Sequence, residues 1–199
     1  TLDFFRRGGS LPCSENYYRL MPPETYGPTN PEYFPLIDGV RKVPPPSSYN
    51  SRWQPCVSNP AVVRVMADAV LDHFRKNPEA LGLNVSVNDG WGDCACEACR
   101  AMDAPDADYS RREGMCDRYV KFTNRIAEIV EREFPDKAIV FLAYSATSSP
   151  PTTVKLRPTI LPVLTVDSAF AAWDRWMATG LRRMGLYLHH NGRSHFILP

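Results

Sequence analysis

Residues 83–92 of the chain read LNVSVNDGWG. The pattern predicts a short buried strand over 83–87 that runs into a polar turn at Asn88–Asp89–Gly90. In parallel α/β folds, the residues that do the chemistry gather at the carboxyl ends of such strands. This stretch therefore points to a fold class and supplies the first candidate site residues.

Helix and strand patterns alternate on both sides of this stretch. Asn59 or the serine before it can cap a helix that has Pro60 in its first turn. Three-and-four-residue spacing of apolar side chains, and near-continuous apolar runs, mark the other elements. The predicted helices cover about 60–77, 113–134 and 168–179, and the predicted strands cover 83–87, 138–143, 160–166 and 184–188. This alternation is typical of an α/β fold with a parallel sheet.

Two segments depart from the alternation. Residues 1–57 are loop-rich, and Asp38–Gly39 between apolar pairs predicts a short hairpin within them. Residues 145–159 join two predicted strands without any helical pattern, although they are long enough for a parallel crossover. The chain is therefore interpreted as one segment, 1–199, with β/α units over 58–199.

The number of strands sets the expected architecture. A (β/α)₈ barrel has eight parallel strands and typically about 250 residues, whereas this chain of 199 residues shows half the strands. Parallel strands with open edges are avoided in native proteins. We expect a partial (β/α)₈ barrel, a segment of a larger TIM-barrel-like domain. The alternative is a small open sheet or an obligate oligomer.

Composition excludes some partners. The net charge is +1, so no strong field argues for nucleic acid. No apolar run approaches the roughly 20 residues of a transmembrane helix, so no membrane insertion is expected. The sequence lacks an initiator Met and a signal-peptide pattern, and we expect it to begin inside a longer or processed protein.

Asp89 is the first candidate catalytic residue, with Asn88 beside it. Glycosidic cleavage usually needs two carboxyl groups, one of which protonates the leaving oxygen. The glycines around Trp91 allow close approach of backbone to a ligand, and an exposed indole suits the face of a sugar ring. The alternative is that Asn-Asp-Gly merely makes a turn that Asp89 caps.

The other predicted strand ends also carry polar or ionisable groups. Asp167 is a candidate second carboxyl, or else the cap of the next helix. Tyr144 could bind substrate or pack in the core. His189, His190 and Asn191 could contact sugar hydroxyls or act in acid/base chemistry. Glu15 and Glu24 lie in the loop-rich start and could reach the same edge.

Six cysteines form the other notable group. Cys94, Cys96 and Cys99 lie close together in sequence, with Cys56 and Cys116 as candidate partners. Three thiolates at this spacing can hold structural zinc if a fourth ligand joins them. Disulfides within the group, or to Cys13, are the rival interpretation, and free thiols are the third.

Several motifs together resemble a known family. They are Tyr18–Glu24, Asn30–Gly39, Cys56–Pro60, Ser86–Gly90, the cysteine cluster with Arg100–Ala101, and Leu142–Tyr144 before Pro150–Pro151. Over about residues 15–165 the chain resembles a widespread bacterial domain of unknown function, DUF4838, which is similar to glycoside hydrolase barrels of the α-glucuronidase and hexosaminidase kind. The resemblance implies a barrel and an exported, secreted or periplasmic protein that acts on a glycan. The family motif falls on Asn88–Gly90 and on Cys56, Cys94, Cys96 and Cys99, which favours one shared cysteine site.

These observations lead to three hypotheses. The first is an exported glycoside hydrolase that uses Asp89 and needs no cofactor for catalysis. Its partners would be a carbohydrate substrate and the remaining part of the parent barrel. The second is a noncatalytic glycan-binding barrel that depends on Trp91. The third is a structural module with a zinc or disulfide site.

Overall fold

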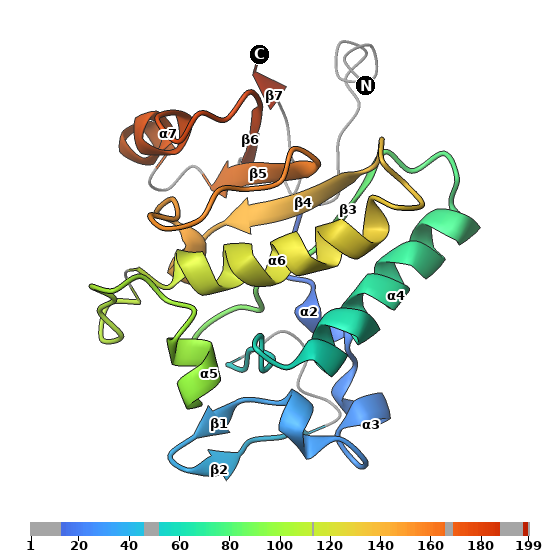
Figure 1. Ribbon diagram of the computed structural model, residues 1–199, viewed down its shortest axis with the longest axis vertical. Coiled ribbons are helices and arrows are strands. Elements are labelled where there is room, and N and C mark those ends of the chain that lie inside the picture. The colour runs from blue at the N-terminus through green and yellow to red at the C-terminus, as the bar shows by residue number, and fades with distance from the viewer. Residues whose placement is uncertain (1–12, 46–51, 113, 166–168, 188–196, 199) are drawn as a thin grey trace.

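The computed structural model describes residues 13–45, 52–112, 114–165, 169–187 and 197–198. Within these residues the main sheet has the strand order β3–β4–β5–β6–β7 (Figure 1). Its strands are β3 (Gly82–Asn84), β4 (Ala138–Ala143), β5 (Ile160–Thr165), β6 (Met184–Tyr187) and β7 (Ile197–Leu198). β3 to β6 run parallel in chain order, and β7 pairs antiparallel with β6. The parallel α/β prediction is confirmed, and β7 is an addition to it.

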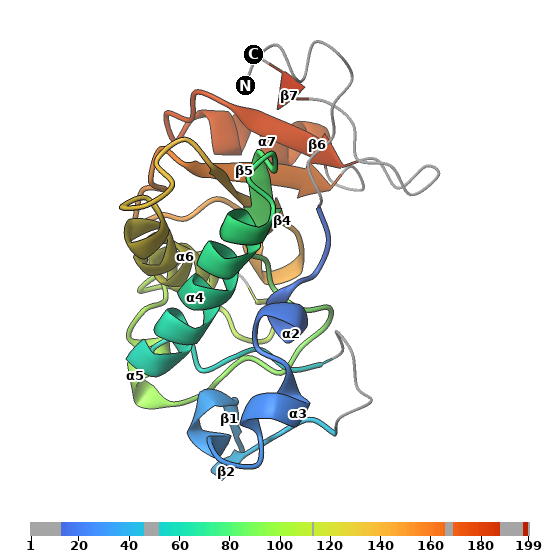
Figure 2. The ribbon, with the colours of Figure 1, turned by 90° about the vertical axis from the view of Figure 1, so that its right-hand side faces the viewer.

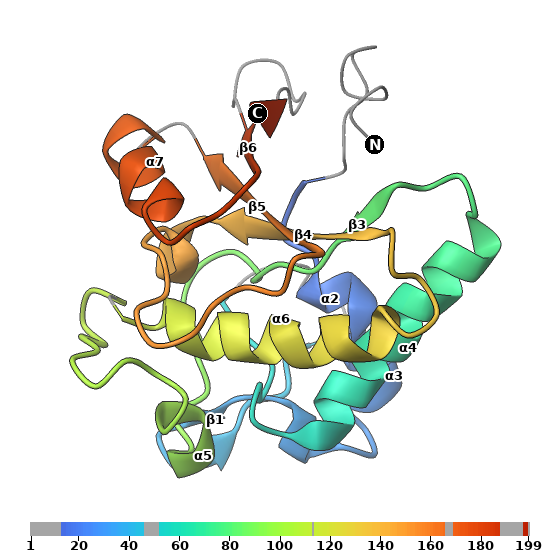
Figure 3. The same cartoon turned by 45° about the horizontal axis from the view of Figure 1, so that its top comes forward.

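Three longer helices accompany this sheet. They are α4 (Pro60–Lys76), α6 (Cys116–Val130) and α7 (Ala169–Met177). α6 and α7 pack on β5, and α4 packs on α6. The side chain of Asn59 caps α4 by accepting a hydrogen bond from Ala61 N at 2.9 Å, as its sequence position predicts. Figure 3 shows α6 lying along the sheet with α4 beside it, and Phe74 of α4 packs on Phe134, which follows the end of α6, with ring centroids 5.5 Å apart.

The two faces of the sheet differ. Ile139 and Phe141 of β4 join the large core with the helices, whereas Val140 and Leu142 belong to a small cluster on the opposite face. On α7, Trp176 is fully buried with its ring 6.3 Å from that of Phe141, so α7 covers the same face as α6. Alternate side chains of each strand thus separate a helix-covered face from a second face.

The edge of the sheet at β3 is occupied by the segment just before α2 (Tyr17–Leu20). The backbone N–H groups of Asn16 and Tyr17 donate to Ser86 O. The Ser86 hydroxyl accepts from Leu142 N at 2.8 Å, in place of the next backbone bond between β3 and β4. For this reason the regular strand ends at Asn84, although 83–87 was the predicted extent.

Polar side chains of α6 hold the irregular crossover between β4 and β5. Buried Asp117 accepts from the backbone N–H groups of Thr152 and Thr153 at 2.8 and 2.6 Å. Asn124, seven residues on, donates to a backbone carbonyl and accepts from a backbone N–H of the same loop. Glu131, seven residues further and directly after the last residue of α6, pairs with Arg157 at 2.5 Å. Three side chains at seven-residue spacing thus hold this loop in place, although it contains no crossover helix of its own.

The hairpin lies far from β6 and β7 (Figures 1 and 2). Its strands β1 (Leu36–Ile37) and β2 (Val40–Arg41) pair antiparallel, and Asp38 and Gly39 have φ of 50° and 75°, as an Asp-Gly turn requires. The remaining short elements are α3 (Pro23–Tyr26), η1 (Pro31–Tyr33), α5 (Glu97–Arg100) and η2 (Ser145–Thr147). Among the described helices, none has the length and apolar character to cross a membrane.

Candidate functional site

Asp89 lies beyond the carboxyl end of β3 with its side chain exposed. One carboxylate oxygen, Oδ1, accepts from Gly90 N at 2.9 Å, and the Tyr144 hydroxyl donates to the same oxygen at 3.4 Å. Both the turn-capping role and a solvent-facing carboxylate are therefore present in one residue. The strand ends of β3 and β4 meet here, as the parallel sheet predicts.

Asn88 has a different role from its neighbour because its side chain is fully buried. Its Oδ1 accepts from Tyr18 N at 2.9 Å, and its Nδ2 donates to Trp53 O at 3.0 Å. The Gln54 carboxamide exchanges two further bonds with the Asn88 backbone, at 2.8 and 3.0 Å. Asn88 therefore positions the turn by joining three segments of the chain.

Tight backbone packing fixes the turn after Asp89. Arg52 N donates to Asp89 O at 2.9 Å, and Gln54 N donates to Gly92 O at 3.0 Å. Gly92 has φ of 100°, and a Cβ placed there would lie 2.2 Å from Arg52 O. Only glycine fits at this close approach.

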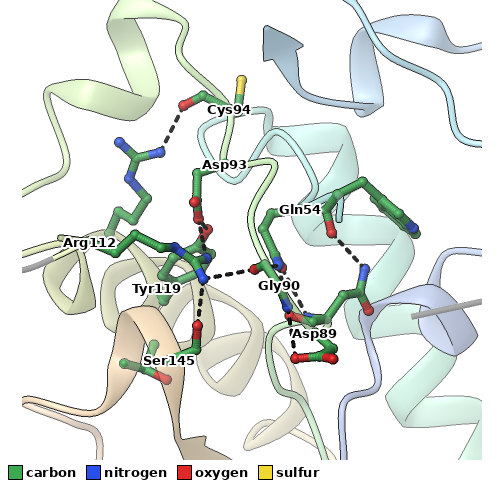
Figure 4. A network of polar contacts seen from close by, with 12 residues as sticks. Gln54, Asp89, Gly90, Asp93, Cys94, Arg112, Tyr119 and Ser145 are labelled. Carbon is green, nitrogen blue, oxygen red and sulfur yellow. Dashed lines mark hydrogen bonds and ion pairs between the residues drawn. The ribbon is translucent and has the colours of Figure 1, made fainter. Parts of the chain in front are cut away.

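Arg112 connects the loops that follow β3 and β4 (Figure 4). Its guanidinium donates to Gly90 O at 2.8 Å and to Ser145 Oγ at 2.5 Å, and it pairs with Asp93 at 2.8 Å. It also lies 5.4 Å from the centroid of the Trp91 ring. Trp91 is nevertheless 55% exposed, so the indole is oriented by a cation–π contact while much of it faces solvent.

The side chain of Asp93 helps to hold Arg112 in place. Besides the ion pair with Arg112, its Oδ1 accepts from the Tyr119 hydroxyl. Burial, reinforced by the Asp93 carboxylate, raises the pKa of Tyr119 well above its ordinary value. Tyr119 therefore remains a protonated donor to Asp93 (Figure 4).

Tyr144 begins a row of polar side chains across the next strands. It follows Ala143, which pairs with Leu164, so it lies beside Thr165, and Thr165 pairs with Tyr187. Tyr144 and Tyr187 both pack against the small cluster on the face opposite the main core. The row brings hydroxyl groups from the ends of β4, β5 and β6 to one edge of the sheet.

Four predicted site residues lie outside the described residues. They are Asp167, His189, His190 and Asn191. They follow β5 and β6 directly in sequence, and their roles stay predictions.

The cysteines Cys56, Cys94, Cys96 and Cys99 form one cluster whose sulfur atoms all lie within 4.8 Å of one another. None of the six cysteines, all of which are in the described residues, forms a disulfide. Hydrogen bonds from Cys94 and Cys99 lower the pKa of the Cys56 thiol, and the same bonds raise the pKa of the two donors. The prediction that Cys56 joins the three sequence neighbours is confirmed, and such a group could bind a metal ion.

Arg112, Gln54 and Tyr187 were absent from the sequence-based candidates. Arg112 and Gln54 lie in irregular loops, where no periodic pattern identifies them. Tyr187 is the last residue of the observed β6, but the predicted strand runs to 188, so the strand-end rule selected the residues after it.

Comparison with known proteins gives one match. A family model described as a domain of unknown function, DUF4838, matches residues 5–168. No curated protein and no solved structure matches the chain. Because the family model covers well over half of the 199 residues, the chain belongs to the DUF4838 family.

Proposed function

We propose that this protein is an exported glycoside hydrolase, or a close relative of one, that acts on a polysaccharide or other glycan through Asp89. One observation carries the proposal: an exposed carboxylate, Asp89, and an exposed indole, Trp91, lie two positions apart on a turn that is otherwise fixed by buried contacts. A rigid scaffold that presents a few unburied groups is typical of a binding or catalytic site.

Each exposed group has a chemical role in this proposal. The Trp91 indole stacks on the apolar face of a sugar ring. Asp89 acts as the acid or base, or orients the substrate, and the Tyr144 hydroxyl at 3.4 Å holds the carboxylate in place. Tyr187 lies on the same edge, with the buried Thr165 between it and Tyr144. Hydrolysis by paired carboxyl groups needs no cofactor.

The proposed architecture is part of a (β/α)₈ barrel. Two features support it: the parallel strands follow chain order without a reversal, and the three longer helices cover one face. A doubly wound sheet instead reverses its strand order and carries helices on both faces. Under this proposal, the rest of the parent barrel or Asp167 supplies the second carboxyl.

A noncatalytic glycan-binding module is the second candidate. One observation favours this candidate. Asp93 is the other carboxylate in the Asp89 loop, and it is already bonded to Arg112 and Tyr119. In this case Trp91 and Tyr144 bind the sugar and Asp89 is only a contact.

The test is a hydrolysis screen of the complete protein against aryl glycosides and uronic-acid or amino-sugar oligosaccharides. Wild type should cleave at least one substrate, and Asp89→Asn should reduce kcat by about two to four orders of magnitude while folding is unchanged. Trp91→Ala is the matched control, and it should raise KM more than it lowers kcat. Full activity in Asp89→Asn would refute a catalytic role for Asp89. Sugar binding without cleavage in any variant would select the glycan-binding module.

A further inference from the structure

The cysteine cluster has the dimensions of a metal site. Cys56 Sγ lies 3.8 Å from both Cys96 Sγ and Cys99 Sγ. A tetrahedral zinc centre with Zn–S bonds of about 2.3 Å places its sulfur atoms about 3.8 Å apart. A disulfide instead requires sulfur atoms about 2.05 Å apart. The observed spacing therefore matches four ligands around one ion rather than two covalent pairs.

The surroundings of the sulfur atoms suit thiolates. Cys94 Sγ accepts from Leu36 N at 3.3 Å and from Arg41 Nη1 at 3.7 Å. The Cys99 thiol donates to Ser58 Oγ at 3.2 Å, and the same oxygen lies 3.6 Å from Cys56 Sγ and 3.7 Å from Cys96 Sγ. N–H donors such as Leu36 and Arg41 orient metal ligands and stabilise their negative charge. Four thiolates around Zn²⁺ carry a net charge of about −2, and Arg41 offsets part of it.

The four ligands come from two distant segments. Cys56 lies just before the capping residue of α4, and the other three lie in the loop after β3 and in α5. The outer donors Leu36 and Arg41 belong to the two strands of the hairpin. An ion at this point would fasten the hairpin, the start of α4 and the far end of the Asp89 loop to one another.

We propose that Cys56, Cys94, Cys96 and Cys99 bind one Zn²⁺ ion as a structural tetrathiolate site. On binding, each thiol gives its proton to solvent and its sulfur forms one bond to zinc, with no change of oxidation state. Four protein ligands leave no open position for substrate, so the ion supports the fold and does not take part in hydrolysis. The site is independent of the proposed glycan chemistry.

The first test measures metal and thiols in the complete protein purified without added metal. Elemental analysis should find about one zinc per chain, and a thiol reagent should modify the four cluster cysteines only after a chelator or denaturant is added. Cys96→Ser should lose most of the zinc. Cys116→Ala, which changes a buried cysteine outside the cluster, is the matched control and should retain it.

A second measurement covers the case in which Cys96→Ser fails to fold. Wild-type protein reconstituted with Co²⁺ should show the strong visible absorption of tetrahedral cobalt and the near-ultraviolet sulfur-to-cobalt charge transfer. Zinc should then displace the cobalt and abolish both bands. Disulfide-linked cluster cysteines in the native protein, iron in place of zinc, or metal-free protein with four reactive thiols would each overturn the proposal.

Discussion

Replacing Asn88 with alanine should destabilise the protein, whereas the same change at Asp89 should not. Asn88→Ala removes the bonds to Tyr18 N and Trp53 O and leaves both backbone groups without these partners. The loss of each bond costs about 1–3 kcal/mol, so the free energy of unfolding should fall by about 2–6 kcal/mol. Asp89→Ala removes an exposed side chain and should change it by less than about 0.5 kcal/mol.

The assay is urea-induced unfolding followed by circular dichroism, with the m-value compared between variants. Asn88→Asp sharpens the experiment, because it keeps the acceptor for Tyr18 N but turns the donor to Trp53 O into a second acceptor. It should destabilise at least as much as Asn88→Ala. Equal losses of unfolding free energy in Asn88→Ala and Asp89→Ala, or no loss in Asn88→Ala, would refute the reasoning that Asn88 positions the turn while Asp89 faces solvent.

Two further predictions concern the backbone and pH. Gly92→Ala should lower the free energy of unfolding by about 3 kcal/mol or more, since its Cβ would meet Arg52 O at 2.2 Å. Gly39→Ala, with φ of 75° but open space, should cost only about 1 kcal/mol in the same denaturant titration. Burial raises the pKa of Glu131, but the hydrogen bonds from Arg157 and Thr159 together with the charge of Arg157 outweigh it, and the net pKa is lowered. Glu131→Gln should therefore be less stable than wild type by about 1 kcal/mol at pH 7, and thermal melts should show this gap closing as the pH falls below about 4.3; a gap that persists at low pH would contradict the ion pair.

Local signals explain which parts of the fold could be predicted. The cap at Asn59, the Asp-Gly turn and the apolar run at 138–143 each involve neighbouring residues, and the structure agrees with all three. The end of β3 could not be read in the same way. Just beyond it, the Ser86 hydroxyl takes the Leu142 N–H, and Ser86 O accepts from Asn16 and Tyr17, which lie some seventy positions earlier and carry no strand pattern.

The candidate site could also be predicted only in part. The strand-end rule correctly places Asp89 beside Tyr144, because strand order alone brings those ends together. The strand-end rule cannot distinguish a side chain that faces solvent from one that is buried. It therefore selects Asn88 and Asp89 equally. The role of Arg112 depends on contacts with two loops, those after β3 and β4, and both are distant from Arg112 in the chain.

The measurement that tests the central claim most directly is an NMR titration of the backbone amide and indole N–H signals with uronic-acid and amino-sugar oligosaccharides. A glycan that binds at the proposed edge should shift the Trp91 indole signal and the amide signals of Asp89 and Gly90, with saturation, and the Trp91→Ala variant should lose the response. Signals of the hairpin around Gly39 serve as the internal reference and should stay in place. Saturable shifts confined to another surface, or no shift at Trp91 with any oligosaccharide, would contradict a glycan site at Asp89.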